Sequence, residues 1–73
     1  MIFLAQNLKA LRKRKKMTQQ DLAEAVGVKR PSIGAYEEGR AEPKLEILLR
    51  MAQLFHVEVT DLIARNLEKS SEH

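Results

Sequence analysis

A glycine turn between two short helical segments constrains the fold of this chain more than any other feature of its sequence. Thr18 is followed three residues later by Asp21, which is the pattern of a helix N-cap with an acidic first turn. Gly27 has the residue type that most often ends a helix, and Pro31 marks the start of a second helix just beyond it. The sequence therefore predicts a helix over residues 19–26, a tight turn and a second short helix.

Apolar residues recur at helical spacing through the rest of the chain, and no run alternates with the period of two that a half-buried strand shows. Start and stop signals divide this pattern into further helices. The first helix runs from about Phe3 to Lys16, and the third ends at Gly39. Pro43 opens a fourth helix that continues to Phe55, and a fifth runs from Val59 to about Leu67. The expected fold class is an all-α bundle of five helices without a sheet.

Length and composition exclude several classes of protein. A chain of 73 residues supplies one small hydrophobic core, which is too little for a two-domain enzyme. It has no cysteine and only two histidines, so we expect no disulfide, no metal site and no cofactor. Catalytic arrangements of the Cys–His or Ser–His–Asp type are absent, and the adjacent Glu37 and Glu38 diverge on a helix surface, so an enzyme is not expected.

The apolar stretches of the sequence are short. None approaches the roughly 20 residues of a transmembrane helix, and the apolar start of the chain is too short for the core of a signal peptide. We therefore expect no membrane partner.

The basic residues are concentrated in the first part of the chain, although the net charge is only +3. Residues 1–30 contain eight basic and two acidic side chains, whereas residues 31–73 contain five basic and eight acidic ones. An asymmetry of this kind favours a polyanion as the partner of the first part. Solvated helix faces are the alternative, and charge alone does not decide between the two.

The residues around the glycine turn carry a more specific signal. They read Thr-Gln-Gln-Asp-Leu-Ala at 18–23, Val-Gly-Val at 26–28, Ser-Ile at 32–33, Tyr-Glu-Glu-Gly at 36–39 and proline at 43. This pattern resembles the phage-repressor and Cro type of helix-turn-helix, also called the XRE family of bacterial regulators, over about residues 8–63. The resemblance implies a lambda-repressor-like bundle of five helices in residues 1–67, in which helices two and three form the helix-turn-helix. Residues 68–73 would then be a polar tail or the start of a linker.

The resemblance implies sequence-specific binding to double-stranded DNA, with the second helix of the motif in the major groove. The protein would then be a transcription regulator of repressor type, in the bacterial cytoplasm and associated with the nucleoid. A homodimer on a pseudo-palindromic site is expected, with half-sites about 34 Å apart, because one recognition helix reads only a few base pairs. The fifth helix and the apolar residues Ile2 and Phe3 are the candidate dimer surfaces. A C-terminal effector domain or a partner protein beyond this chain is also expected from relatives.

A second function is compatible with the same fold. Protein-interaction modules and antitoxin-type components would pack the third helix on a partner protein instead of on DNA. Gly34 and Ala35 offer few hydrogen-bonding groups on that helix, so this alternative stays open.

The resemblance also assigns candidate DNA contacts. Gln19 matches a family glutamine that begins the second helix and hydrogen-bonds a phosphate, at a helix end that favours anions. Arg30 is the first choice for base reading, because a guanidinium can donate two parallel hydrogen bonds to guanine O6 and N7. The remaining candidates are Gln20 beside Gln19, then Lys29, Pro31, Ser32 and Ala35 on the recognition helix, and Arg40 and Lys44 for phosphates before the fourth helix.

Several further positions are expected to have structural roles. Relatives have an ion pair at the positions of Arg12 and Glu37, and we expect this pair to position the recognition helix. Tyr36 stands where relatives often bury an aromatic side chain, so it is expected in the core. Lys29 replaces a common Ser or Thr, so the recognition helix should lack a side-chain N-cap. His56 stands where a left-handed backbone is expected.

Overall fold

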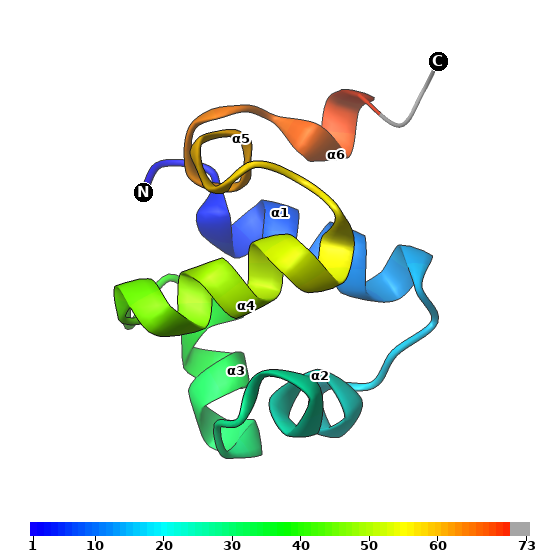
Figure 1. The fold of residues 1–73 in the computed structure, drawn as a ribbon, viewed down its shortest axis with the longest axis vertical. Coiled ribbons are helices and arrows are strands. Elements are labelled where there is room, and N and C mark those ends of the chain that lie inside the picture. The colour runs from blue at the N-terminus through cyan, green and yellow to red at the C-terminus, as the bar shows by residue number, and fades with distance from the viewer. Residues whose placement is uncertain (71–73) are drawn as a thin grey trace.

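Over residues 1–70, the part of the chain that the computed structural model describes, all regular secondary structure is helical (Figure 1). Residues 71–73, the end of the expected polar tail, lie outside the described residues. The helices are α1 (Leu4–Arg14), α2 (Gln19–Val26), α3 (Arg30–Glu37), α4 (Leu45–Phe55), α5 (Val59–Ala64) and the short α6 (Leu67–Ser70). In Figure 1, α2 and α3 lie at the lower end of the molecule and α5 and α6 at the upper end, with α1 and α4 between them. The predicted all-α five-helix bundle is confirmed, except that the chain after α4 forms two short helices, α5 and α6, where one helix from Val59 to about Leu67 was expected.

Some helix ends differ from the predicted ones. α1 ends at Arg14 and does not continue to Lys16, which takes a left-handed backbone with φ 57°. α4 begins at Leu45, so the buried Pro43 precedes the helix instead of opening it. At the other end of α4, His56 has the predicted left-handed backbone, with φ 56° and ψ 44°.

A buried asparagine divides the predicted fifth helix into α5 and α6. Asn7 on α1 is fully buried, and its Nδ2 donates to the carbonyl oxygens of Leu62 at 2.8 Å and Arg65 at 2.6 Å. Its Oδ1 accepts a hydrogen bond from the backbone N–H of Leu67 at 2.9 Å. These bonds satisfy backbone groups that helix ends leave open. Arg65 therefore takes an extended backbone with ψ 149°, and Leu67 begins α6 instead of ending α5.

Local hydrogen bonds hold the helix-turn-helix itself. The hydroxyl oxygen of Thr18 accepts from the backbone N–H of Asp21 at 3.0 Å, and Oδ2 of Asp21 accepts from the N–H of Thr18 at 2.9 Å, which completes a capping box. Gly27 ends α2 with φ 80°, and its N–H and that of Val28 both donate to the carbonyl of Ala23. The predicted tight turn between α2 and α3 is therefore present.

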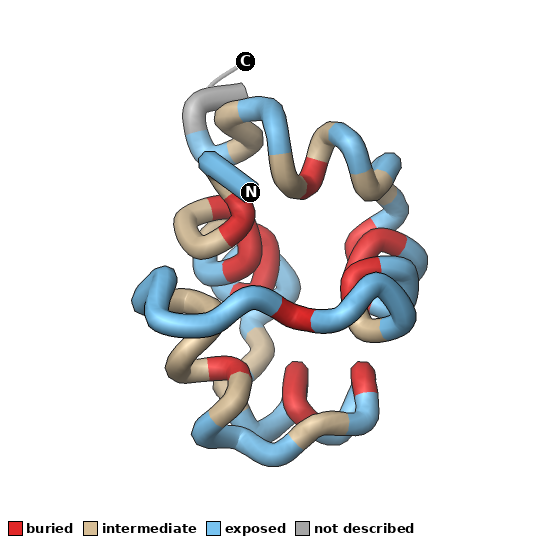
Figure 2. Tube along the Cα trace, turned by 90° about the vertical axis from the view of Figure 1, so that its left-hand side faces the viewer, coloured by how far each residue is buried: buried red, intermediate tan, exposed pale blue. Residues whose placement is uncertain are grey.

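Helices α1 to α5 all contribute to one apolar core, and the buried positions are red in Figure 2. The buried apolar residues are Leu4, Leu8, Leu11, Leu22, Ala23, Val26, Ile33, Leu48, Met51, Ala52, Phe55 and Leu62. α3 supplies only Ile33 to this set and packs against α1 and α2. Apolar burial therefore contributes less to the attachment of α3 than to that of α1, α2 or α4, each of which supplies three or more buried apolar residues.

Replacement of Gly27 by alanine should destabilise the protein more than the same replacement of Gly39. Both residues have left-handed backbones, with φ 80° and φ 74°, where an L side chain costs about 1–2 kcal/mol. A Cβ at Gly27 would also lie 2.8 Å from Nη1 of Arg50, which donates a 3.1 Å hydrogen bond to the carbonyl of Val26, whereas a Cβ at Gly39 would meet nothing within 4 Å. In urea unfolding, Gly27→Ala should lower the free energy of unfolding by about 0.5–1.5 kcal/mol more than Gly39→Ala does. This difference is the usual net contribution of one hydrogen bond. Equal losses would contradict a role for Arg50 at this turn.

Candidate nucleic-acid interface

The exposed side of α3 presents the predicted base-reading residues on one helix. α3 begins after Lys29, whose backbone is extended and whose side chain makes no cap hydrogen bond, so the predicted lack of a side-chain cap is observed. Lys29, Arg30 and Pro31 are exposed in the first turn, and Pro31 fixes the backbone there without an N–H to satisfy. Ser32 and Ala35 are half-buried on the same helix.

A buried ion pair attaches the C-terminal end of α3 to α1. Nε of Arg12 donates to Oε2 of Glu37 at 2.6 Å, and Nη2 of Arg12 donates to Oε1 at 3.1 Å, so the pair is bidentate. The two side chains are only 10% and 3% exposed. The hydrogen bond to Glu37, helped by its charge and opposed by burial, raises the pKa of Arg12. Nη1 of Arg12 also donates to the carbonyl of Met17 at 2.8 Å, which attaches the pair to the loop before α2.

Gln19 connects this ion pair to the exposed first turn of α3. Its Nε2 donates to Oε1 of Glu37 at 3.1 Å, and its Oε1 accepts from Nη1 of Arg30 at 3.3 Å. A carboxylate can only accept hydrogen bonds, so Glu37 determines which end of the Gln19 amide faces inward. The amide oxygen is thereby presented to Arg30. The structure thus brings together Arg12, Glu37, Gln19 and Arg30. Of these contacts, only the pair of Arg12 with Glu37 was expected from the sequence.

The other predicted polar contacts lie around this centre without joining it. Gln20 points to its own helix, where Nε2 donates to Oε2 of Glu24 at 2.8 Å. Arg40 pairs with Glu38 at 2.6 Å, and both side chains are more than half exposed. Lys44 is exposed at the N-cap of α4.

An apolar groove of about 500 Å³ runs between α3 and the start of α4. It is lined by Pro31, Ser32 and Ala35 from α3, by Lys44, and by Val28 and Ile47 among others. Sequence reasoning missed the groove, because it joins residues on two segments that no local pattern relates.

Tyr36 forms part of the groove wall. It is half-buried and packs against the core, so the expectation of a core position holds only for part of the ring.

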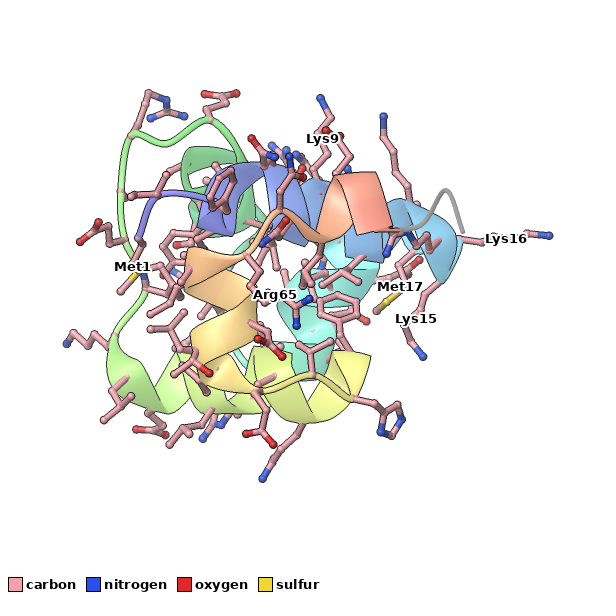
Figure 3. The ribbon with its side chains drawn as sticks, turned by 90° about the horizontal axis from the view of Figure 1, so that it is seen from above. Met1, Lys9, Lys15, Lys16, Met17 and Arg65 are labelled. Atoms are coloured by element: carbon pink, nitrogen blue, oxygen red, sulfur yellow. The ribbon has the colours of Figure 1, made fainter. Side chains whose placement is uncertain are left out.

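Most basic residues of α1 and of the turn after it point away from the bundle, whereas Arg12 contacts α3. Lys9, Lys15 and Lys16 point outward from the bundle in Figure 3, and Lys13 is also exposed. Arg14 instead donates to the carbonyl oxygens of Leu67 at 2.8 Å and Glu68 at 3.4 Å, and so holds α6 on α1.

Within residues 1–70, none of the helices has both the length and the apolar character that crossing a bilayer requires. No group of three or more His, Cys, Asp and Glu side chains in that range is placed to hold a metal ion.

The capped α2, the glycine turn and the exposed α3 on a small helical bundle define a helix-turn-helix domain. Comparison with known families agrees, because the family model described as "Helix-turn-helix" matches residues 8–62. The chain belongs to this helix-turn-helix family.

Several known proteins are similar to this chain. The uncharacterized HTH-type transcriptional regulator YqaE of Bacillus subtilis is 39% identical over 59 residues, which are 81% of this chain and 51% of YqaE. The antitoxin PezA of Streptococcus pneumoniae is 32% identical over 63 residues, which are 86% of this chain and 40% of PezA. The chain thus spans about half the length of these relatives, or less.

A solved structure has a similar fold over nearly its whole length. The P22 c2 repressor, crystallised in complex with synthetic operator 9T, superposes with a TM-score of 0.81 at 26% identity, and the match covers 88% of this chain and 97% of the repressor chain. The lambda-repressor-like fold implied by the sequence is therefore confirmed.

Removal of either partner of the Arg12–Glu37 pair should be strongly destabilising. Arg12→Ala or Glu37→Ala leaves the other charge buried without its partner, which typically costs about 3–5 kcal/mol. The double variant Arg12→Met with Glu37→Met removes both charges, so it should lose much less stability than either single variant. Urea unfolding of the three variants measures the difference, and a single variant within about 1 kcal/mol of wild type, as for a solvent-exposed pair, would contradict this account.

Proposed function

We propose that this chain binds double-stranded DNA sequence-specifically and acts as a transcription regulator of repressor type, with α3 in the major groove. The observation that carries the proposal is the exposed first turn of α3, where Gln19 at the start of α2 holds Arg30. A B-DNA major groove admits an α-helix. Membership of the helix-turn-helix family and similarity to YqaE and to the operator-bound P22 c2 repressor support it.

The proposed base contacts follow from the side-chain chemistry along α3. Arg30 donates to O6 and N7 of a guanine. Lys29, beside it, can reach a base edge or a phosphate, and the Ser32 hydroxyl can donate or accept. Pro31 and Ala35 have no polar side-chain atoms, so the base contact open to them is with a thymine methyl group.

The proposed phosphate contacts surround α3. Gln19 has one amide N–H left after its bond to Glu37, and it stands at the N-terminus of α2, where anions are favoured. Gln20, Arg40 and Lys44 are exposed on the flanks of this surface. The bonds of Gln20 to Glu24 and of Arg40 to Glu38 are solvent-exposed, so little free energy opposes their exchange for phosphates.

A homodimer on a pseudo-palindromic site is part of the proposal, since two α3 helices read more base pairs than one. The protein would then act at the nucleoid in the bacterial cytoplasm. Because YqaE is about twice as long as its match to this chain, a C-terminal effector domain or a partner protein is also proposed as the source of regulation.

In-vitro selection of bound duplexes tests the role of Arg30. The wild-type protein should select a motif that contains a fixed guanine, and Arg30→Ala should lose that guanine preference, at a cost of about 1–3 kcal/mol of discrimination at one base pair. Arg65→Ala is the matched control, because Arg65 is exposed at the α5–α6 end, away from α3. The same motif from Arg30→Ala and wild type would refute base reading by Arg30.

The salt dependence of binding tests the phosphate contacts. If about four to six phosphates are neutralised, log K should fall with log salt concentration at a slope of about −4 to −5. Lys44→Ala should make the slope shallower by about 0.9 if Lys44 contacts one phosphate. A nearly flat dependence for the wild-type protein would rule out this mode of binding.

An antitoxin-type interaction module is the second candidate function, and the similarity to PezA is the observation in its favour. The two functions differ in what the selection experiment yields. A module that acts only through protein contacts selects no motif from a pool of random duplexes, whereas the proposed regulator does.

A further inference from the structure

An acidic side chain continues the side of α3 that carries proposed base contacts. Pro31, Ala35 and Glu38 are separated by four and three residues, so they lie on one side of the helix. Glu38 is the C-cap residue of α3, and its backbone is still close to helical, with φ −93° and ψ −3°. Its side chain is 61% exposed. A negative charge therefore stands at one end of the surface that is proposed to meet DNA.

Backbone hydrogen bonds fix the place of Glu38 and of its partner Arg40. The N–H of Glu38 donates to the carbonyl of Gly34 at 3.0 Å, and the N–H of Arg40 donates to the carbonyl of Ala35 at 2.9 Å. Nε of Arg40 in turn donates to Oε1 of Glu38 at 2.6 Å. A phosphate bound by Arg40 would consequently lie close to the carboxylate of Glu38.

The stability of α3 does not explain an acid at this position. The C-terminal end of a helix carries partial negative charge, which disfavours a carboxylate there. The side chains of Arg40 and Glu38 are 64% and 61% exposed, and exposed ion pairs contribute little to stability. Glu37, one residue earlier, differs because its carboxylate is buried against Arg12.

A carboxylate on this surface can act on DNA in two ways. It can accept a hydrogen bond from the N4 amino group of a cytosine, which would be base reading. It can also weaken binding to any sequence, because it repels phosphates and shares the charge of Arg40. The contact with Arg40 favours the second way, since Arg40 is a proposed phosphate contact and the carboxylate already occupies its Nε.

We propose that Glu38 restrains DNA binding through its charge, an inference that rests on the proposed function. Glu38 lowers the affinity for selected and random duplexes alike, because both have the same phosphate backbone. Release of Arg40 to a phosphate costs little, but the carboxylate that remains beside the phosphates opposes binding. The restraint limits how long the protein stays on DNA of the wrong sequence, where phosphate contacts supply essentially all of the affinity.

Replacement of Glu38 by glutamine tests the proposal, because the amide keeps the size of the side chain and an oxygen that can accept from Arg40. Glu38→Gln should bind the selected duplex and a random duplex about two- to fivefold more tightly than wild type, which is the scale of one exposed charge interaction. The gain should shrink as salt is added, because salt screens charges on exposed side chains. Titrations of fluorescently labelled duplexes at several salt concentrations measure both effects.

The matched control is Glu58→Gln, which removes the same charge from an exposed residue. Glu58 is the N-cap residue of α5, at the other end of the molecule from α3 in Figure 1. Glu58→Gln should leave both affinities close to those of wild type. Circular dichroism should show the same helix content in all three proteins.

Several outcomes would overturn the proposal. Equal affinities of wild type and Glu38→Gln, or an equal gain from Glu58→Gln, would show that a charge at this place has no effect of its own. Weaker binding of Glu38→Gln to both duplexes would show that Glu38 positions Arg40 for a phosphate. A loss confined to the selected duplex, with a changed motif, would assign Glu38 to base reading. In all these cases the proposed function stands, whereas a wild-type protein that binds neither duplex overturns the proposed function as well.

Discussion

The carboxylate of Glu37 is the point at which three helices are joined. It accepts two hydrogen bonds from Arg12 on α1 and one from Gln19 on α2, while its own backbone belongs to the last turn of α3. α3 contributes one fully buried apolar residue, Ile33, so this polar centre is an important part of what fixes its orientation. Because the ion pair is nearly excluded from solvent, its geometry is favoured over arrangements that would leave either charge unpaired.

The same carboxylate connects the interior of the bundle to its proposed DNA-binding surface. It accepts from the nitrogen of the Gln19 amide, and the amide oxygen therefore faces outward, where it accepts from Arg30. A long arginine side chain loses much rotamer freedom when it binds in one geometry. In the proposed mode of binding, partial ordering of Arg30 before it meets a base reduces that loss, so the buried pair would favour base reading by Arg30.

Much of the fold followed from local rules in the sequence. The capping box at Thr18 and the left-handed turn at Gly27 depend on neighbouring residues, and both were predictable for that reason. The side chain of Asn7 acts on residues 55 to 60 positions away, so no local pattern indicated that it would divide the last predicted helix. In the site, the pair of Arg12 with Glu37 was expected from resemblance to relatives. The role of Gln19 between that pair and Arg30 could not be predicted, because it needs the spatial arrangement of three helices. The groove beside α3 escaped prediction for the same reason.

The most direct test of this account is a double-mutant cycle between Gln19 and Arg30, measured as discrimination between the selected duplex and one changed at the guanine assigned to Arg30. Gln19→Met keeps the size of the side chain but removes its amide. If Gln19 positions Arg30, Gln19→Met reduces discrimination in the wild-type background and causes no further reduction when Arg30 is already alanine. If Gln19→Met instead weakens both duplexes equally, whether or not Arg30 is present, Gln19 acts only as a phosphate contact and the proposed coupling of the buried ion pair to base reading is wrong.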